Sequence, residues 1–144
     1  MSKCNTTDLI TARGQQWVID HQKGDPDQPF FLYLAYDTPH AALQLPTTAY
    51  PEGSGLDGGL QWIGETGQMI NTAVGTIDSY RHPDYVDRGW RDVEVRFATM
   101  IRRIDHCVCD LLQTLRDLNI DDETLVVISS DNGPLNVSYI AGES

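Results

Sequence analysis

The sequence is short of positive charge. Ten lysines and arginines stand against 21 aspartates and glutamates, so the formal net charge is −11 and the isoelectric point is near 4.5. Nucleic acids and other polyanions are bound through clustered Lys and Arg side chains, and an excess of carboxylates repels them. The composition therefore argues against a nucleic-acid-binding protein.

Cysteines and long apolar runs are also few. The three cysteines are an odd number and too scattered for a disulfide framework. Cys107 and Cys109 point about 200° apart on a helix, so they cannot clamp one metal ion, and we expect both to be small buried side chains. No run reaches the ~20 apolar residues of a membrane span, and the amino terminus lacks the charged and apolar regions of a signal peptide.

The chain is long enough for one domain. Its 144 residues fall in the usual single-domain range and can bury one core. Residues 37–89 are rich in Gly, Pro and Thr, and a segment of that length without regular structure is usually functional or disordered. We therefore expect a single domain over residues 1–144 with a long irregular insertion at about 37–89.

Two helices are predicted from the spacing of apolar residues. Residues 8–21 form the first, with Thr6 or Thr7 as its N-cap. In residues 91–118 apolar side chains recur three and four positions apart, which indicates a long amphipathic helix lying on a sheet. The apolar stripe of this helix comprises Val93, Phe97, Met100, Ile101, Ile104, Val108, Leu111, Leu112, Leu115 and Leu118.

Two strands are predicted on either side of the long helix. Residues 30–36 are an apolar, aromatic-rich run, and residues 125–128 are a short β-branched run typical of a strand buried on both faces. A strand, a helical crossover and a second strand favour a parallel, right-handed unit. The sequence therefore predicts an α/β fold.

Polar residues follow each predicted strand. Asp131 and Asn132 end the second strand, and Asp37 and His40 come directly after the first. In open α/β sheets ligands bind at the carboxyl ends of strands, carboxylate and amide oxygens suit Ca²⁺ or Mg²⁺, and an imidazole suits proton transfer near neutral pH. The alternative is structural: Asp-Asn-Gly-Pro is also an ordinary turn, and His40 is then a loop side chain.

Three segments together resemble the sulfatases of the alkaline-phosphatase superfamily, in that family's order. They are Pro-Phe-Phe-Leu-Tyr-Leu-Ala-Tyr at 29–36 with Pro39-His40, Phe-Ala-Thr-Met-Ile-Arg-Arg-Ile-Asp at 97–105, and Asp-Glu-Thr-Leu-Val-Val-Ile-Ser-Ser-Asp-Asn-Gly-Pro at 122–134. Residues 41–85 look like the insertion of an arylsulfatase-like subgroup. The resemblance implies an alkaline-phosphatase-like α/β sandwich with parallel strands flanked by helices, of which this chain is part.

The resemblance also implies a sulfuric ester hydrolase that uses formylglycine and a divalent metal. It implies that Asp131 and Asn132 bind Ca²⁺, with Mg²⁺ as the alternative, and that His40 is a catalytic residue lying against the sulfate. Formylglycine is made from the cysteine of a Cys-x-Pro-Ser-Arg or Cys-x-Ala-x-Arg motif, which this chain does not contain. We therefore expect an internal fragment of the catalytic domain that is inactive by itself.

The partner implied by the resemblance is a sulfated small molecule or glycan, in a periplasmic, secreted or lysosomal setting. Two alternatives stay open. One is a phosphodiesterase or phosphatase of the same superfamily, which would use a serine or threonine nucleophile and two metals. The other is a non-catalytic, sulfatase-like binding or structural module that has kept the fold and lost the chemistry, and the missing cysteine motif favours it.

Overall fold

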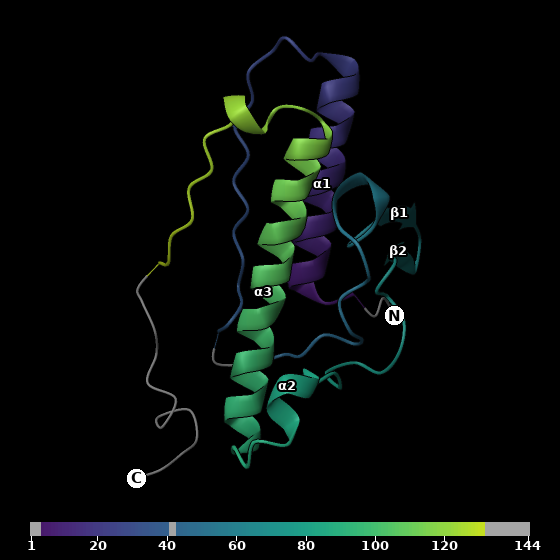
Figure 1. Cartoon of the computed structure of the whole chain (residues 1–144). Helices are drawn as coiled ribbons and strands as arrows, with labels where there is room; N and C mark the ends of the chain where they lie inside the picture. The colour runs from purple at the N-terminus through teal and green to yellow at the C-terminus, as the bar shows by residue number, and fades with distance from the viewer. Residues whose placement is uncertain (1–3, 41–42, 132–144) are drawn as a thin grey trace.

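Two long helices lie side by side and organise the rest of the chain (Figure 1). The structure is a computed structural model that describes residues 4–40 and 43–131. Beside the helices α1 (Thr6–Gly24) and α3 (Asp92–Asp117), the described elements are the short helix α2 (Pro83–Val86), the strands β1 (Trp62–Glu65) and β2 (Gln68–Ile70), and the 3₁₀ turns η1 (Gly55–Asp57) and η2 (Asp121–Glu123).

Helix α1 is longer than the sequence predicted and has a different cap. The side chain of Asn5 accepts a hydrogen bond from the backbone N–H of Asp8 at 3.4 Å, which satisfies one of the free N–H groups of the first turn. The expectation that Thr6 or Thr7 caps the helix is therefore wrong. Asn5, Thr6 and Thr7 are three consecutive residues able to cap a helix, and tertiary contacts decide among them.

The prediction of a helix over residues 91–118 is confirmed. Arg91 and Leu118 are the caps of α3, and the side chain of Glu94 accepts a hydrogen bond from the backbone N–H of Arg91 at 2.9 Å. Beyond the last turn, Asn119 has a φ of 57°, a left-handed conformation that asparagine tolerates better than most residues. The chain leaves the helix there.

The buried face of α3 carries polar residues among apolar ones such as Met100 and Cys107. It turns Thr99, Arg103, Asp110 and Thr114 inward, each at most 3% exposed. Gln15 on α1 donates a hydrogen bond to the hydroxyl of Thr114 at 3.1 Å, one of the polar contacts that join the two helices.

The apolar stripe of α3 is only partly covered. Ile101 is 44% exposed, and Ile104, Val108 and Leu111 are half-buried. The expectation that this stripe is buried against a sheet is therefore not met, because the two predicted strands do not form a sheet within the described residues. A helix with a half-exposed apolar stripe and a buried polar face has room for further partners on the apolar side.

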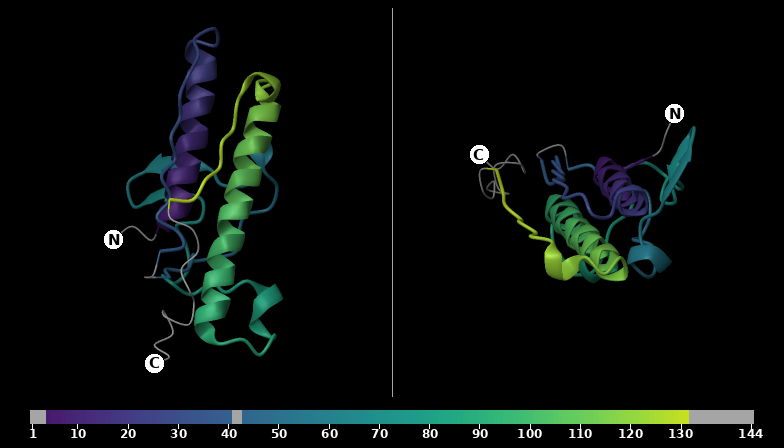
Figure 2. Two further views of the ribbon diagram at one scale, coloured as in Figure 1. Left: turned by 90° about the vertical axis from the view of Figure 1, so that its left-hand side faces the viewer. Right: turned by 90° about the horizontal axis from the view of Figure 1, so that it is seen from above.

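The two predicted strands are extended segments without strand partners. Residues 29–36 and 124–130 enter no strand pairing in the described ranges, where the only sheet is the antiparallel pair β1–β2 with Trp62 opposite Ile70. Both segments run opposite to α1 and α3, and both lie on the same side of the helix pair (Figures 1 and 2). The two segments run in the same direction, as predicted. Their pairing in a parallel sheet stays a prediction.

The outward faces of these segments are apolar. Phe31 is 88% exposed and Tyr33 is 78% exposed, whereas Leu32 and Leu34 are half-buried, an alternation with the period of a strand. In the second segment Leu125 is 88% exposed and Val127 is 77% exposed. Large apolar side chains exposed to this extent mark an interaction surface.

The insertion predicted to be irregular contributes to the core. Leu60 and Ile70 are at most 2% exposed and pack with Ala12 of α1 and Cys107 of α3. The regular structure of residues 37–89 comprises η1, the β1–β2 hairpin and α2. The chain therefore has a core to which both helices and the insertion contribute.

A carboxylate of α3 holds the glycine-rich part of the insertion. Asp110 accepts hydrogen bonds from the backbone N–H groups of Gly55 and Leu60, each at 2.7 Å, and from the hydroxyl of Tyr50 at 2.5 Å. Gly59 has a φ of +65°, and a Cβ there would lie 2.1 Å from a carboxylate oxygen of Asp110. Only glycine fits this position.

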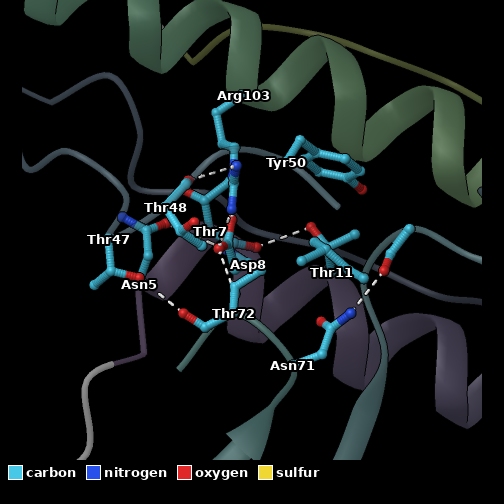
Figure 3. A network of polar contacts seen from close by, with 12 residues as sticks. Asn5, Thr7, Asp8, Thr11, Thr47, Thr48, Tyr50, Asn71, Thr72 and Arg103 are labelled. Atoms are coloured by element: carbon cyan, nitrogen blue, oxygen red, sulfur yellow. Dashed lines mark hydrogen bonds and ion pairs between the residues drawn. The ribbon is translucent and has the colours of Figure 1, made fainter. Parts of the chain in front are cut away.

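A buried ion pair joins α1, α3 and the insertion at one point (Figure 3). Asp8 and Arg103 meet through two bonds of 2.6 and 2.5 Å, with side chains 1% and 3% exposed. Thr72 donates to the carboxylate at 2.8 Å, Arg103 donates to the carbonyl of Thr48 at 3.3 Å, and the ring of Tyr50 lies 4.8 Å from the guanidinium carbon. Burial disfavours the charged form of Arg103, and Asp8 outweighs this effect, so the pKa of Arg103 is raised.

Cys107 and Cys109 are free thiols that differ in burial. Cys107 is fully buried, as expected, and Cys109 is exposed, so the expectation that both are buried is half wrong. Their opposite faces follow from the 100° per residue of an α-helix. Within the described residues no helix is long and apolar enough to cross a membrane.

Asp8→Ala should lower the free energy of unfolding by about 3–5 kcal/mol, because it leaves the guanidinium of Arg103 buried without its partner. The matched control is Asp92→Ala, which breaks the 2.7 Å pair with Arg81, whose two side chains are 34% and 62% exposed. That loss should stay below about 1 kcal/mol. Urea unfolding of both variants measures the difference, and equal losses would contradict the argument.

Stability should fall as the pH rises from about 9 toward about 12. Burial raises the pKa of the Cys107 thiol from its ordinary value of 9.0 to about 12. A thiol that keeps its proton to higher pH in the folded chain stabilises the fold fully below pH 9, and this stabilisation is lost as the pH rises through the folded pKa. In chemical denaturation at a series of pH values, Cys107→Ala should flatten this fall. Cys109→Ala, at an exposed position, should leave it unchanged, and an unchanged profile for both variants would refute the assignment.

Candidate active site

His40 lies in a turn that follows the first extended segment. Its backbone N–H donates to the carbonyl of Asp37 at 2.9 Å, and its own carbonyl accepts from the N–H of Leu43 at 3.0 Å. The Thr38–Pro39 peptide bond within this turn is cis. The side chain of His40 is exposed, as a residue that meets a ligand from solution requires.

A pocket of about 150 Å³ opens beside His40. Its walls come from the start of α1, from the turn that carries His40, and from α3, so three separate parts of the chain form it. The lining residues are Asn5, Thr6, Asp37, Thr38, His40, Leu43, Gln44 and Met100. The pocket has both polar and apolar walls and lies at the positive end of the α1 dipole, which favours an anionic group.

The turn of His40 is tied to both long helices. The hydroxyl of Thr38 lies 2.6 Å from that of Thr7 on α1. Arg96 of α3 donates to the carbonyl of Leu43 at 2.7 Å and also pairs with Asp78. The Arg96 guanidinium and the backbone N–H of Leu45 help to hold the pKa of the Asp78 carboxyl below its ordinary value, against the opposing effect of burial. The backbone around His40 is therefore fixed on two sides.

Asp131 is the last described residue of the second extended segment, and it is exposed. Asn132, the second predicted metal ligand, lies outside the described residues. Both extended segments run toward the end of the molecule where α1 begins, so Asp131 and His40 follow segments that point the same way (Figure 1). Within residues 4–40 and 43–131, no group of three His, Cys, Asp or Glu side chains is placed to hold a metal ion.

Aromatic rings gather around a second histidine, His106 of α3. His106 packs 5.0 Å from the ring of Tyr50 and 6.3 Å from that of His82, and a pocket of about 280 Å³ lies beside it. Burial, followed by the charge of Arg102, lowers the pKa of His106. This is the packing role that its place on a helix indicates.

Sequence reasoning missed the polar network around Asp8, Arg103 and Asp110. Asp8 reads as an ordinary acidic residue in the first turn of a helix, and Arg103 as one charge among several on a long helix. Their sequence separation of 95 residues leaves no local signal of the pair. The available clue was the separation of polar and apolar residues onto different faces of α3. That pattern predicts that the apolar face is the buried one.

The comparisons with known proteins agree on one family. The sulfatase family model matches residues 3–139. The chain is 31% identical over 111 residues to the N-sulphoglucosamine sulphohydrolase of Homo sapiens, a match that covers 74% of this chain and 22% of that protein. The chain thus spans about a fifth of the length of this curated relative. No solved structure matches the chain.

Proposed function

Because the chain belongs to the sulfatase family, we propose that it is part of an enzyme that hydrolyses sulfate esters and that it supplies His40, Asp131 and Asn132 to the active site. The observation that supports this most is the family match across residues 3–139, which includes all three residues. The pocket beside His40 adds a place for an anionic group. The human relative is named for N-sulphoglucosamine, which carries its sulfate on nitrogen and not in an ester, so an O-sulfated and an N-sulfated glucosamine are the first substrates to test.

His40 has the chemistry for two roles at this pocket. An imidazole can donate a hydrogen bond to an anionic sulfate oxygen, and it can move a proton to or from a reacting group near neutral pH. The exposed position of His40 and its place in the pocket wall allow contact with a bound sulfate group. We therefore assign it to the catalytic group.

Asp131 and Asn132 supply oxygen ligands of the kind that Ca²⁺ takes, but too few of them. A calcium ion in a protein takes about 6–8 oxygen ligands, and the described residues bring no three acidic, histidine or cysteine side chains together for a metal. The described residues therefore do not by themselves bring together a metal site. We propose that the remaining ligands, and the formylglycine nucleophile, belong to parts of the enzyme outside this sequence. When bound, such a cation would neutralise charge on the sulfate.

The exposed apolar segments support the same conclusion about the fold. Phe31, Tyr33, Leu125 and Val127 are each at least 77% exposed, on two segments that run in the same direction. We propose that strands from the rest of the enzyme pair with these segments and form the parallel sheet of an alkaline-phosphatase-like sandwich. The helices α1 and α3 then cover one face of that sheet, and the half-exposed stripe of α3 is buried.

The function is tested by Asp131→Ala in the complete enzyme, with hydrolysis of a sulfated glucosamine and the melting temperature as readouts. Loss of activity by at least a hundredfold with little change in melting is expected, since an exposed carboxylate at a strand end contributes little to the core. Asp122→Ala, at another exposed carboxylate, is the matched control and should keep activity. Full activity in Asp131→Ala would show that Asp-Asn-Gly-Pro is only a turn.

The sheet is tested by one substitution in two settings. Phe31→Asp in this chain should change the free energy of unfolding by less than about 0.5 kcal/mol, because the side chain is 88% exposed. In the complete enzyme the same change should cost several kcal/mol, because it buries an unpaired charge in the sheet. Ile77→Asp, at a position 57% exposed in the insertion, is the control. A complete enzyme that tolerates Phe31→Asp would overturn the proposed sheet.

A further inference from the structure

We propose that paired hydroxyl groups on α1 and on residues 36–38 set the position of His40, with Thr7 and Thr38 as positioning residues. These pairs, Thr7 with Thr38 and Thr11 with Tyr36, form a hydroxyl ladder. The inference rests on the proposed function in that His40 is the group being positioned. Thr38 also lines the pocket beside His40, whereas Thr7 does not, so Thr7→Val tests the positioning role without changing the pocket wall.

The ladder is short and well buried on the α1 side. The hydroxyl oxygens of Thr7 and Thr38 are 2.6 Å apart, and those of Thr11 and Tyr36 are 2.9 Å apart. Thr7 and Thr11 are at most 1% exposed. Thr11 donates its single proton to the carbonyl of Thr7 at 2.8 Å, so Tyr36 must be the donor in its pair. Burial raises the pKa of Tyr36 from 10.0 to about 12, so this hydroxyl keeps its proton well above neutral pH.

The spacing of the ladder matches a helix to an extended chain. Four residues along α1 rise about 6 Å, and two residues of an extended segment span about 6.6 Å. One turn farther along the helix, Leu34 packs over Gly14, where a Cβ would come within 2.9 Å of Leu34 Cδ2. A slip of one residue would turn every one of these side chains to the other face. The ladder therefore fixes the register of the segment that leads to His40.

The ladder connects the turn of His40 to the start of α1, next to the buried ion pair. Thr7 is the residue before Asp8, whose buried pair with Arg103 joins both helices. Thr38 lies two residues before His40, within the turn closed by the 2.9 Å bond from His40 N–H to Asp37 O. The bond between Thr7 and Thr38 is therefore the side-chain contact that links the residue next to the ion pair with the turn that carries His40.

The test uses Thr7→Val and Thr38→Val, which keep the shape of the side chain and remove the hydroxyl. Thr47→Val is the matched control, because Thr47 donates a 2.7 Å buried hydrogen bond to the carbonyl of Thr72 away from His40. Thr7→Ser restores the hydroxyl and should rescue. Imidazole NMR signals of this chain are followed against pH, with His40→Gln used to assign the signal among the four histidines.

Both ladder variants should shift the His40 signals and their titration midpoint, whereas Thr47→Val and Thr7→Ser should not. In the complete enzyme, the ladder variants should lower kcat by about 10- to 100-fold with KM little changed, because a small misplacement acts on the transition state. His40 signals that stay unchanged in Thr7→Val and Thr38→Val would overturn the proposal. Full activity in His40→Ala would instead overturn the role of His40 in the proposed function, and the NMR result would still decide on the ladder.

Discussion

The arrangement of this chain depends on the buried pair of Asp8 and Arg103. Two opposite charges taken out of water are stable only when geometry and hydrogen bonds compensate their lost hydration. Here the carboxylate receives both bonds of the guanidinium and one from Thr72, while Tyr50 covers the guanidinium. These requirements bring α1, α3 and two parts of the insertion to one place. The pair holds the insertion at Thr48 and Thr72, and Asp110 holds the part between them.

The two sides of α3 therefore differ in their contacts. The polar side carries Arg103, Asp110 and Thr114, and each of them completes a specific contact with α1 or with the insertion. The apolar side, represented by Ile101 and Val108, is left half-covered beside two extended segments. Such a helix is suited to lie between a polar layer that it organises and an apolar sheet that it covers. The family membership of the chain and its span of about a fifth of the curated relative agree with a sheet completed by other parts of the enzyme.

Several features could be predicted from the sequence because they depend on neighbouring residues. The helix over residues 91–118 follows from apolar spacing, and the different faces of Cys107 and Cys109 follow from helical geometry. The cap of α1 could not be chosen, because Asn5, Thr6 and Thr7 all have suitable side chains. The part of residues 37–89 that enters the core was missed as well, since Leu60 and Ile70 stand in short mixed segments rich in glycine and polar residues. The roles of His40, Asp131 and Asn132 come from resemblance and stay predictions.

The sequence by itself determined the two long helices, the common direction of the two extended segments and the family, because these depend on local patterns and short motifs. Only the tertiary structure decided which face of α3 is buried. The apolar stripe is the stronger local signal for the buried face. The partner of Arg103, however, lies 95 residues away in the sequence. A buried charge without its partner destabilises the fold more than an exposed isoleucine does. The same holds for the turn that carries His40, where the hydroxyl of Thr38 meets that of a residue 31 positions earlier. Distances of this kind are set when the chain folds, and no window of sequence contains both partners.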